Sequence, residues 1–118
     1  MRLTFITLDE VIEIHLDQIR RHGGTFGVRD LGLLESAISV PRAGIRGQYL
    51  HENVYEMAAA YAFHIIRNHP FVDGNKRTGA VSALVFLELN GIEVVATNEE
   101  LYKTVLAIAE GRLDKSSI

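Results

Sequence analysis

The feature that most constrains the fold of this chain is a pair of long apolar stretches, residues 53–68 and 75–89, separated only by residues 69–74. Apolar residues at helical spacing predict that each stretch is a helix. Both stretches are apolar on most sides, so each should be surrounded by other elements. We therefore expect an all-α, compact helical bundle with these two helices at its centre. The segment between them is then held at both ends by the core, which suits a site that needs fixed geometry.

Local signals at helix ends predict the remaining elements. Residues 7–10 and 97–100 both have the capping-box pattern, which predicts that a helix starts at each. Asp30 is the expected N-cap of a short helix, and Pro41 closes that helix. Residues 41–51 show no clear period. In chain order, the expected helices cover residues 7–21, 30–39, 53–68, 75–89 and 97–110.

The loop between the two central helices carries an imidazole and a carboxylate. Pro70 disfavours the α conformation at His69, so the first central helix should stop near Asn68 and leave His69 on the loop. Gly74 can adopt backbone angles closed to other residues, which lets the loop wrap close to a ligand. Asp73 is a hard oxygen ligand and suits Mg²⁺, which commonly takes one or two carboxylates plus phosphate oxygens. The loop thus offers a proton acceptor and a metal ligand together.

The second central helix starts with Asn75, Lys76 and Arg77. Unpaired backbone N–H groups and the helix dipole favour an anion at a helix N-terminus. Two cations at this end oppose the dipole, so helix stability alone does not explain them, whereas a bound polyphosphate would. Basic residues at a helix start are often plain surface. Their fixed spacing from His69 and Asp73 favours a polyphosphate site instead.

The other histidines are weaker candidates for chemistry. His15 and His64 lie inside expected helices among apolar residues, so both are interpreted as structural. His22 and His51 lie near helix ends. The chain contains no H-E-x-x-H motif, which argues against a zinc hydrolase, and no G-x-x-x-x-G-K-[ST] motif, which excludes a P-loop.

Composition predicts a compact cytoplasmic protein. At 118 residues with 47% hydrophobic residues, one domain covering residues 1–118 is expected. There is no cysteine, so neither a disulfide framework nor a thiolate metal site is expected. No apolar run approaches the ~20 residues that span a bilayer, and no signal-peptide pattern is present at the start. A net charge of −3 argues against direct nucleic-acid binding, which needs a basic face.

Residues 69–77, which read HPFVDGNKR, resemble the signature of the Fic/Doc superfamily. The general Fic pattern is H-x-F-x-D/E-G-N-G-R-x-x-R. This chain has Lys76 in place of the second glycine and Ala80 in place of the final arginine, and both departures are typical of the Doc (death-on-curing) branch. Similarity to Doc-type chains extends to residues 21–24, 30–37 and 86–91, so it covers nearly the whole chain. The resemblance implies a Fic/Doc-type helical bundle with the signature loop between two central helices.

The resemblance also implies nucleotide-dependent modification of a protein hydroxyl. Most Fic proteins transfer AMP from ATP to a Ser, Thr or Tyr side chain. Doc instead acts as a kinase on a threonine of elongation factor Tu, and translation stops. Doc-type toxins are controlled by a separate antitoxin protein in trans. The self-inhibitory Fic motif [ST]-x-x-x-E-[GN] is not matched here, since the nearest candidate, Glu110-Gly111, has Leu106 where Ser or Thr is required.

Carried over to this chain, the resemblance implies a role for each residue of the signature. His69 would be the general base that takes the proton of the acceptor hydroxyl. Asp73 would hold Mg²⁺ on the phosphates of ATP. The residues that would cradle these phosphates are Gly74, Asn75, Lys76 and Arg77.

Three functional readings remain open. The first is a Doc-type kinase toxin. The second is an AMP transferase on the same fold, which Lys76 and Ala80 disfavour. The third is a catalytically silent binding module, against which the intact His69 and Asp73 argue.

Overall fold

A computed structural model describes residues 3–45, 48–49 and 53–93, together with Glu100, Lys103 and Ala107. Within these residues the chain forms four helices and one short antiparallel pair of strands. The elements are α1 (Leu8–His22), α2 (Leu31–Ser39), β1 (Gly44–Ile45), β2 (Gln48–Tyr49), α3 (Val54–Asn68) and α4 (Asn75–Leu89). The expected all-α fold is confirmed, because the strands are only two residues long.

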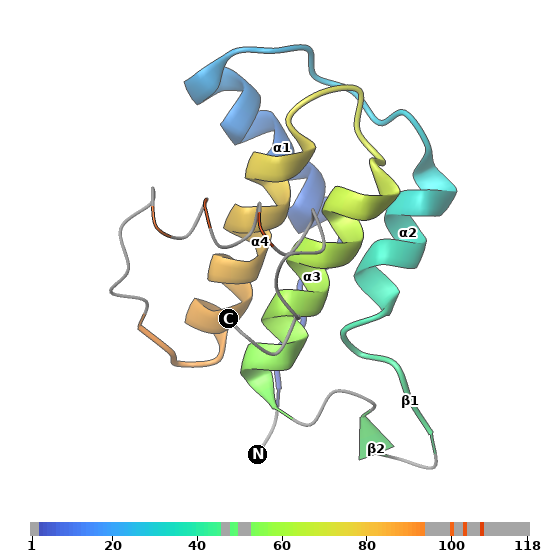
Figure 1. Cartoon of the computed structure of the whole chain (residues 1–118), viewed down its shortest axis with the longest axis vertical. Helices are drawn as coiled ribbons and strands as arrows, with labels where there is room; N and C mark the ends of the chain where they lie inside the picture. Colours follow the sequence, from blue (N-terminus) through green and yellow to red (C-terminus); the bar gives the residue numbers. More distant parts are fainter. Residues whose placement is uncertain are drawn as a thin grey trace.

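The helices α3 and α4 lie side by side at the centre, joined by the loop at residues 69–74 (Figure 1). The helix α1 packs against α4, and α2 packs against α3. The connection from α1 to α2 passes over the same end of the bundle as the loop at residues 69–74 (Figure 1). Two segments distant in sequence therefore meet where the signature lies.

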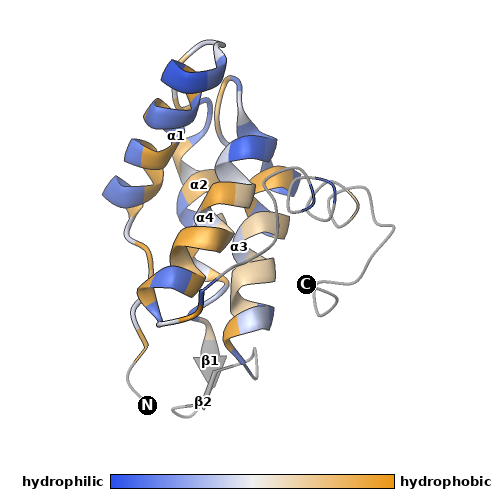
Figure 2. Cartoon of the chain, turned by 90° about the vertical axis from the view of Figure 1, so that its left-hand side faces the viewer, coloured by the Kyte–Doolittle hydropathy of each residue, from blue (hydrophilic) through white to orange (hydrophobic). Residues whose placement is uncertain are grey.

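The core is built mainly from the two central helices. Eight residues of α3 are buried, and the middle of α4 is apolar in Figure 2. Tyr61 is fully buried, and its hydroxyl accepts a hydrogen bond from the Ile6 N–H at 3.1 Å. Burial raises the pKa of the Tyr61 hydroxyl to about 12, so this hydroxyl stays neutral at physiological pH. A Cβ at Gly79 of α4 would lie 2.9 Å from Ile66 Cγ1 and 3.2 Å from the Ala62 carbonyl oxygen, so the missing side chain lets α4 approach α3 closely.

Side-chain caps fix the starts of three helices, and the sequence analysis predicted two of these caps, Thr7 and Asp30. Thr7 forms a complete capping box with Glu10 at the start of α1. The Asp30 carboxylate accepts the Leu33 N–H at 3.0 Å, and the Asn53 side chain accepts the Glu56 N–H at 2.9 Å. The observed bounds of α1 to α4 consequently agree with the expected ones to within a residue or so.

Two further expectations from the sequence have a different outcome in the structure. Residues 41–51, expected to lack a clear period, contain the strand pair β1–β2, which is too short to show alternation. The second capping box at residues 97–100 and most of the expected last helix lie outside the described residues. Among the helices that are described, none combines the length and apolar character needed to cross a membrane.

Candidate functional site

The chain leaves α3 through an unusual backbone conformation at His69. His69 is the C-cap of α3 with φ 53° and ψ 51°, the left-handed region, and among the described residues it is the only non-glycine with positive φ. Its N–H still donates to the Ile65 carbonyl at 3.2 Å, and the following Pro70 cannot extend the helix. The helix therefore ends at Asn68, as expected, and the imidazole of His69 lies exposed on the loop.

The side chain of Asn75 closes the loop from within. Its amide nitrogen donates to the Phe71 carbonyl at 3.0 Å, and its Oδ1 accepts the Phe71 N–H at 2.9 Å. Asn75 is only 4% exposed, so this side chain is committed to the loop backbone. Any contact of Asn75 with a phosphate therefore falls to its backbone N–H. The Phe71 ring is fully buried and anchors the loop in the core.

A buried histidine of α1 supports this anchor. The ring of His15 stacks on Phe71 with centroids 3.9 Å apart and planes 13° from parallel. His15 Nε2 accepts the Gly27 N–H at 3.4 Å, which assigns the ring proton to Nδ1, 3.2 Å from Thr78 Oγ1. Burial lowers the pKa of His15 below its ordinary 6.5, against an opposing effect of the Asp73 charge. His15 is structural as predicted, yet its contact with the signature loop was not foreseen.

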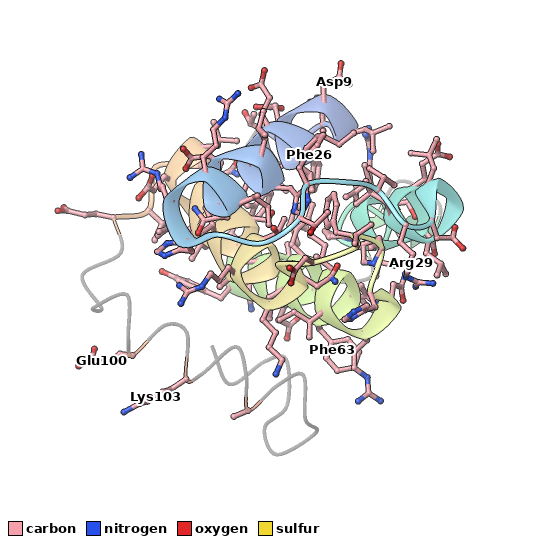
Figure 3. All side chains as sticks on the ribbon, turned by 90° about the horizontal axis from the view of Figure 1, so that it is seen from above. Asp9, Phe26, Arg29, Phe63, Glu100 and Lys103 are labelled. Atoms are coloured by element: carbon pink, nitrogen blue, oxygen red, sulfur yellow. The ribbon has the colours of Figure 1, made fainter. Side chains whose placement is uncertain are left out.

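The connection between α1 and α2 runs along the loop and is hydrogen-bonded to it. Val28 and Phe71 form an antiparallel bridge, and the Val72 N–H donates to the Gly27 carbonyl at 2.9 Å. The Pro70 carbonyl accepts the N–H groups of Arg29 and Asp30, at 2.7 and 3.0 Å. Figure 3, seen from above, shows this connection crossing the ends of the central helices. The conformation of the loop is therefore fixed by a segment about forty residues earlier in the chain.

Arg29 is a site-supporting residue that the sequence analysis missed. Its Nε donates to the His69 carbonyl at 2.8 Å, and a terminal nitrogen donates to the Asn68 carbonyl at 3.1 Å (Figure 3). These carbonyls end α3, where a cation is favoured by the helix dipole. No sequence signal marks Arg29, because its partners lie on a distant element.

The carboxylate of Asp73 is oriented by two backbone donors. Oδ1 accepts the Gly74 N–H at 3.0 Å, and Oδ2 accepts the Thr25 N–H at 3.2 Å. A carboxylate has about four lone-pair positions, so acceptor capacity remains on both oxygens. The described residues contain no group of three or more acidic or histidine side chains able to hold a metal. As a single hard oxygen donor, Asp73 fits Mg²⁺ that takes its other ligands from phosphates and water.

The start of α4 leaves its backbone donors without a side-chain cap. Its N-cap is Gly74, with φ 72°, a left-handed conformation that suits glycine. The first N–H groups of a helix have no acceptor within the helix, and the N-cap Gly74 makes no side-chain hydrogen bond to them. Lys76 and Arg77 are exposed in this first turn, which contains no acidic residue. The local field at this helix start is positive, and the first backbone N–H groups of the helix are directed towards the space before it.

These groups share one cavity of about 370 Å³. All six residues assigned by the sequence analysis line it, namely His69, Asp73, Gly74, Asn75, Lys76 and Arg77. The helix α1 contributes the opposite wall, including Gln18, Ile19 and His22. The sequence analysis placed His22 near a helix end but not at the cavity, and in the structure its side chain is exposed. His64 is half-buried with its ring edge-on to Phe63, and His51 lies outside the described residues.

Comparison with known proteins agrees with this geometry. The sequence profile of the Fic/DOC family matches residues 5–87. A protein called Toxin Doc from Mycolicibacterium smegmatis is 42% identical over 74 residues, which cover 63% of this chain and 57% of that protein. A protein called Protein kinase doc from Escherichia phage P1 is 34% identical over 113 residues, covering 96% of this chain and 88% of that protein. The loop, the uncapped helix start and the shared cavity thus lie within a matched region, and the chain belongs to the Fic/DOC family.

Proposed function

We propose that this chain is a Doc-like toxin that transfers the γ-phosphate of ATP to a hydroxyl of a protein, with a threonine of elongation factor Tu as the acceptor. One Fic/Doc domain across residues 1–118 would carry the activity, acting in the cytoplasm where ATP and translation factors are found. The observation that carries the proposal is the convergence of His69, Asp73 and the positive start of α4 on one cavity. The similarity to a protein named as a kinase, over 96% of this chain, supports it.

The chain supplies the groups that phosphoryl transfer needs, which are mainly positioning and charge neutralisation. The first backbone N–H groups of α4 and the charges of Lys76 and Arg77 would hold the phosphates of ATP. His69, on the rim of the same cavity, would accept the proton of the acceptor hydroxyl on a ring nitrogen. Asp73 would hold Mg²⁺ against the phosphates, and this ion would supply further neutralisation of their charge. The acceptor oxygen, freed of its proton, then attacks the γ-phosphorus and ADP leaves.

The AMP-transferase alternative is less well supported by this chain. Lys76 stands where the Fic pattern has glycine, so a side chain and a charge occupy space that would otherwise admit phosphates close to the helix. Ala80 stands where the Fic pattern has a second arginine, and Ala80 is 5% exposed within the core cluster. An arginine at this position would have to be accommodated in packed surroundings. Both features favour a nucleotide pose that presents the γ-phosphate.

Control of the proposed activity would come from an antitoxin protein supplied in trans. The name Toxin Doc of one relative supports a toxin–antitoxin pairing. The sequence of 118 residues contains no self-inhibitory Fic motif, which is consistent with an external inhibitor.

The proposal is tested by incubating the protein and elongation factor Tu with ATP labelled at either the γ or the α position. We expect the γ label alone to be transferred, and mass spectrometry to find a phosphate on a threonine. His69→Ala should abolish transfer and leave the unfolding temperature nearly unchanged, because an exposed loop histidine contributes little to packing. Transfer of the α label would establish the AMP alternative. An unchanged transfer rate in His69→Ala would show that His69 is not the general base.

A further inference from the structure

Gly24, shortly after α1, has no part in the proposed chemistry, yet it lies beside the carboxylate of Asp73, the proposed metal ligand. Gly24 has φ +111°, and a Cβ built on it would lie 2.8 Å from Asp73 Oδ2 and 3.2 Å from Asp73 Cγ. The next residue, Thr25, donates its N–H to this same Oδ2 at 3.2 Å. The backbone at residues 24–25 thus occupies the space against which the Asp73 carboxylate rests.

We propose that the Gly24–Thr25 backbone is the positioning element of Asp73: the Thr25 N–H fixes Oδ2, and the absence of a side chain at Gly24 leaves room for the carboxylate. This inference rests on the proposed function, since it assumes that Asp73 holds Mg²⁺. The Gly74 N–H binds the other oxygen at 3.0 Å, so the two donors together fix the plane of the carboxylate. Each oxygen keeps one further lone-pair position for a cation or its water.

The Gly74 N–H alone cannot fix the orientation of the Asp73 carboxylate relative to the rest of the fold. It belongs to the residue that follows Asp73, so it moves with the loop and does not tie the carboxylate to another part of the fold. The Thr25 donor comes from a segment that is itself held, because Gly27 binds both Val72 and His15. Partners outside the direct ligand set commonly orient a metal ligand, and their loss typically lowers metal affinity about 10- to 100-fold.

The substitution that addresses the inference most directly is Gly24→Ala. The atoms nearest to its Cβ are Asp73 Oδ2 at 2.8 Å and Ile19 Cδ1 at 3.1 Å, both at the ends of side chains. The closer of these two contacts is relieved when the carboxylate rotates away from Thr25. Ala at positive φ also strains the backbone, independently of Asp73. Gly91→Ala is the matched control, because Gly91 has φ +82° and no atom lies within 4 Å of the added Cβ. Gly91 follows α4 at the end opposite the cavity.

The first measurement uses no metal and no nucleotide. Amide hydrogen exchange followed by NMR should show the Thr25 N–H protected in the unaltered protein and in Gly91→Ala. It should exchange faster in Gly24→Ala and in Asp73→Ala, while the neighbouring Val72 N–H stays protected. Asp73 is exposed, so Asp73→Ala keeps the test available if Gly24→Ala does not fold. Equal protection of Thr25 with and without the Asp73 carboxylate would overturn the inference.

The second measurement is Mn²⁺ binding by electron paramagnetic resonance in the presence of a non-hydrolysable ATP analogue. We expect the Mn²⁺ concentration for half-saturation to rise about tenfold or more in Gly24→Ala and to stay unchanged in Gly91→Ala. If Gly24→Ala binds Mn²⁺ as the unaltered protein does, the positioning role is wrong while the proposed function stands. If the unaltered protein takes up no Mn²⁺ with the analogue, the proposed function and the metal-positioning role fail together.

Discussion

The helices α1 and α4 are both fifteen residues long, yet they begin in opposite ways. The start of α1 is closed by its own side chains: Glu10 N–H donates to Thr7 Oγ1 at 3.2 Å, and Thr7 N–H donates to Glu10 Oε1 at 2.9 Å. Its first turn carries the acidic residues Asp9 and Glu10. The start of α4 has a glycine cap, no side-chain acceptor and no acidic residue, and instead carries Lys76 and Arg77.

The two helix starts differ in what they contribute: the start of α1 stabilises the fold, whereas the start of α4 suits ligand binding. A side-chain cap such as that of α1 is worth about 1 kcal/mol, and acidic residues near a helix start add a few tenths more. The helices α2 and α3 also begin with side-chain caps, Asp30 and Asn53. Among the described helices, only α4 forgoes this stabilisation, and its uncapped start faces the cavity. At a helix start without a side-chain cap, the first backbone N–H groups can bind the phosphates of the proposed substrate.

Reversing the charge at the start of α4 should have the largest effect. Lys76→Glu replaces a cation that would face the phosphates with an anion, so binding of a non-hydrolysable ATP analogue with Mg²⁺ should weaken by about 10- to 100-fold. Stability should stay equal or rise slightly, because an acidic residue suits a helix N-terminus. Isothermal calorimetry gives the affinity, and urea unfolding gives the stability.

The reciprocal change on α1 is the control for this experiment. Asp9 is exposed in the first turn of α1, and Asp9→Lys should lower the free energy of unfolding by about 0.3–1 kcal/mol. The affinity for the ATP analogue should not change. If the two charge reversals weaken nucleotide binding equally, overall charge rather than the start of α4 governs binding.

Removing the cap of α1 should have an intermediate effect on stability alone. Thr7→Ala deletes the acceptor of the Glu10 N–H and should cost about 1 kcal/mol of unfolding free energy. Phosphoryl transfer, measured under conditions where the variant remains folded, should proceed at the unaltered rate. A loss of transfer without a loss of stability would mean that the two helix starts are not functionally distinct.

The smallest expected effect concerns the contact that joins the two helices, between His15 of α1 and Thr78 of α4. Burial lowers the pKa of His15 in the folded protein, so below pH 6.5 the unfolded chain binds the proton more readily than the folded chain. Stability from this group is therefore complete above pH 6.5 and declines as the pH falls toward the lowered value. Urea unfolding between pH 7.5 and 5 should show a steeper decline for the unaltered protein than for His15→Gln. Parallel declines would show that His15 does not titrate differently on folding.

The sequence predicted helices well wherever their ends depend on local contacts. Thr7, Asp30 and Asn53 each bind a backbone N–H three residues later, so the signal and the structure it produces are adjacent in the chain. The six candidate site residues lie within one contiguous motif, so the sequence could place them near one another, and the structure shows that they line one cavity.

The residues that hold the motif in shape were not predictable, because their partners are distant in sequence. Thr25 is 48 residues from Asp73, and Arg29 is 40 residues from His69. His15 was interpreted as structural, but the ring against which it stacks could not be identified from its sequence neighbours. The β1–β2 pair was missed for a different reason, because two-residue strands carry no period.

The hydrogen bonds between residues 24–30 and the loop also determine when the site can form during synthesis of the protein. A fragment that begins at Asn53 would contain every residue of the signature. In that fragment, the Asp73 carboxylate would lack the Thr25 donor, and the carbonyls at the end of α3 would lack Arg29. The N-terminal half is synthesised first, and it supplies the hydrogen-bond donors that hold the motif once the C-terminal half has been made. The hydrogen bonds to Asp73 and to the end of α3 can then form only when the two halves pack together. If the protein is split before Asn53, we expect these hydrogen bonds only when the two pieces associate.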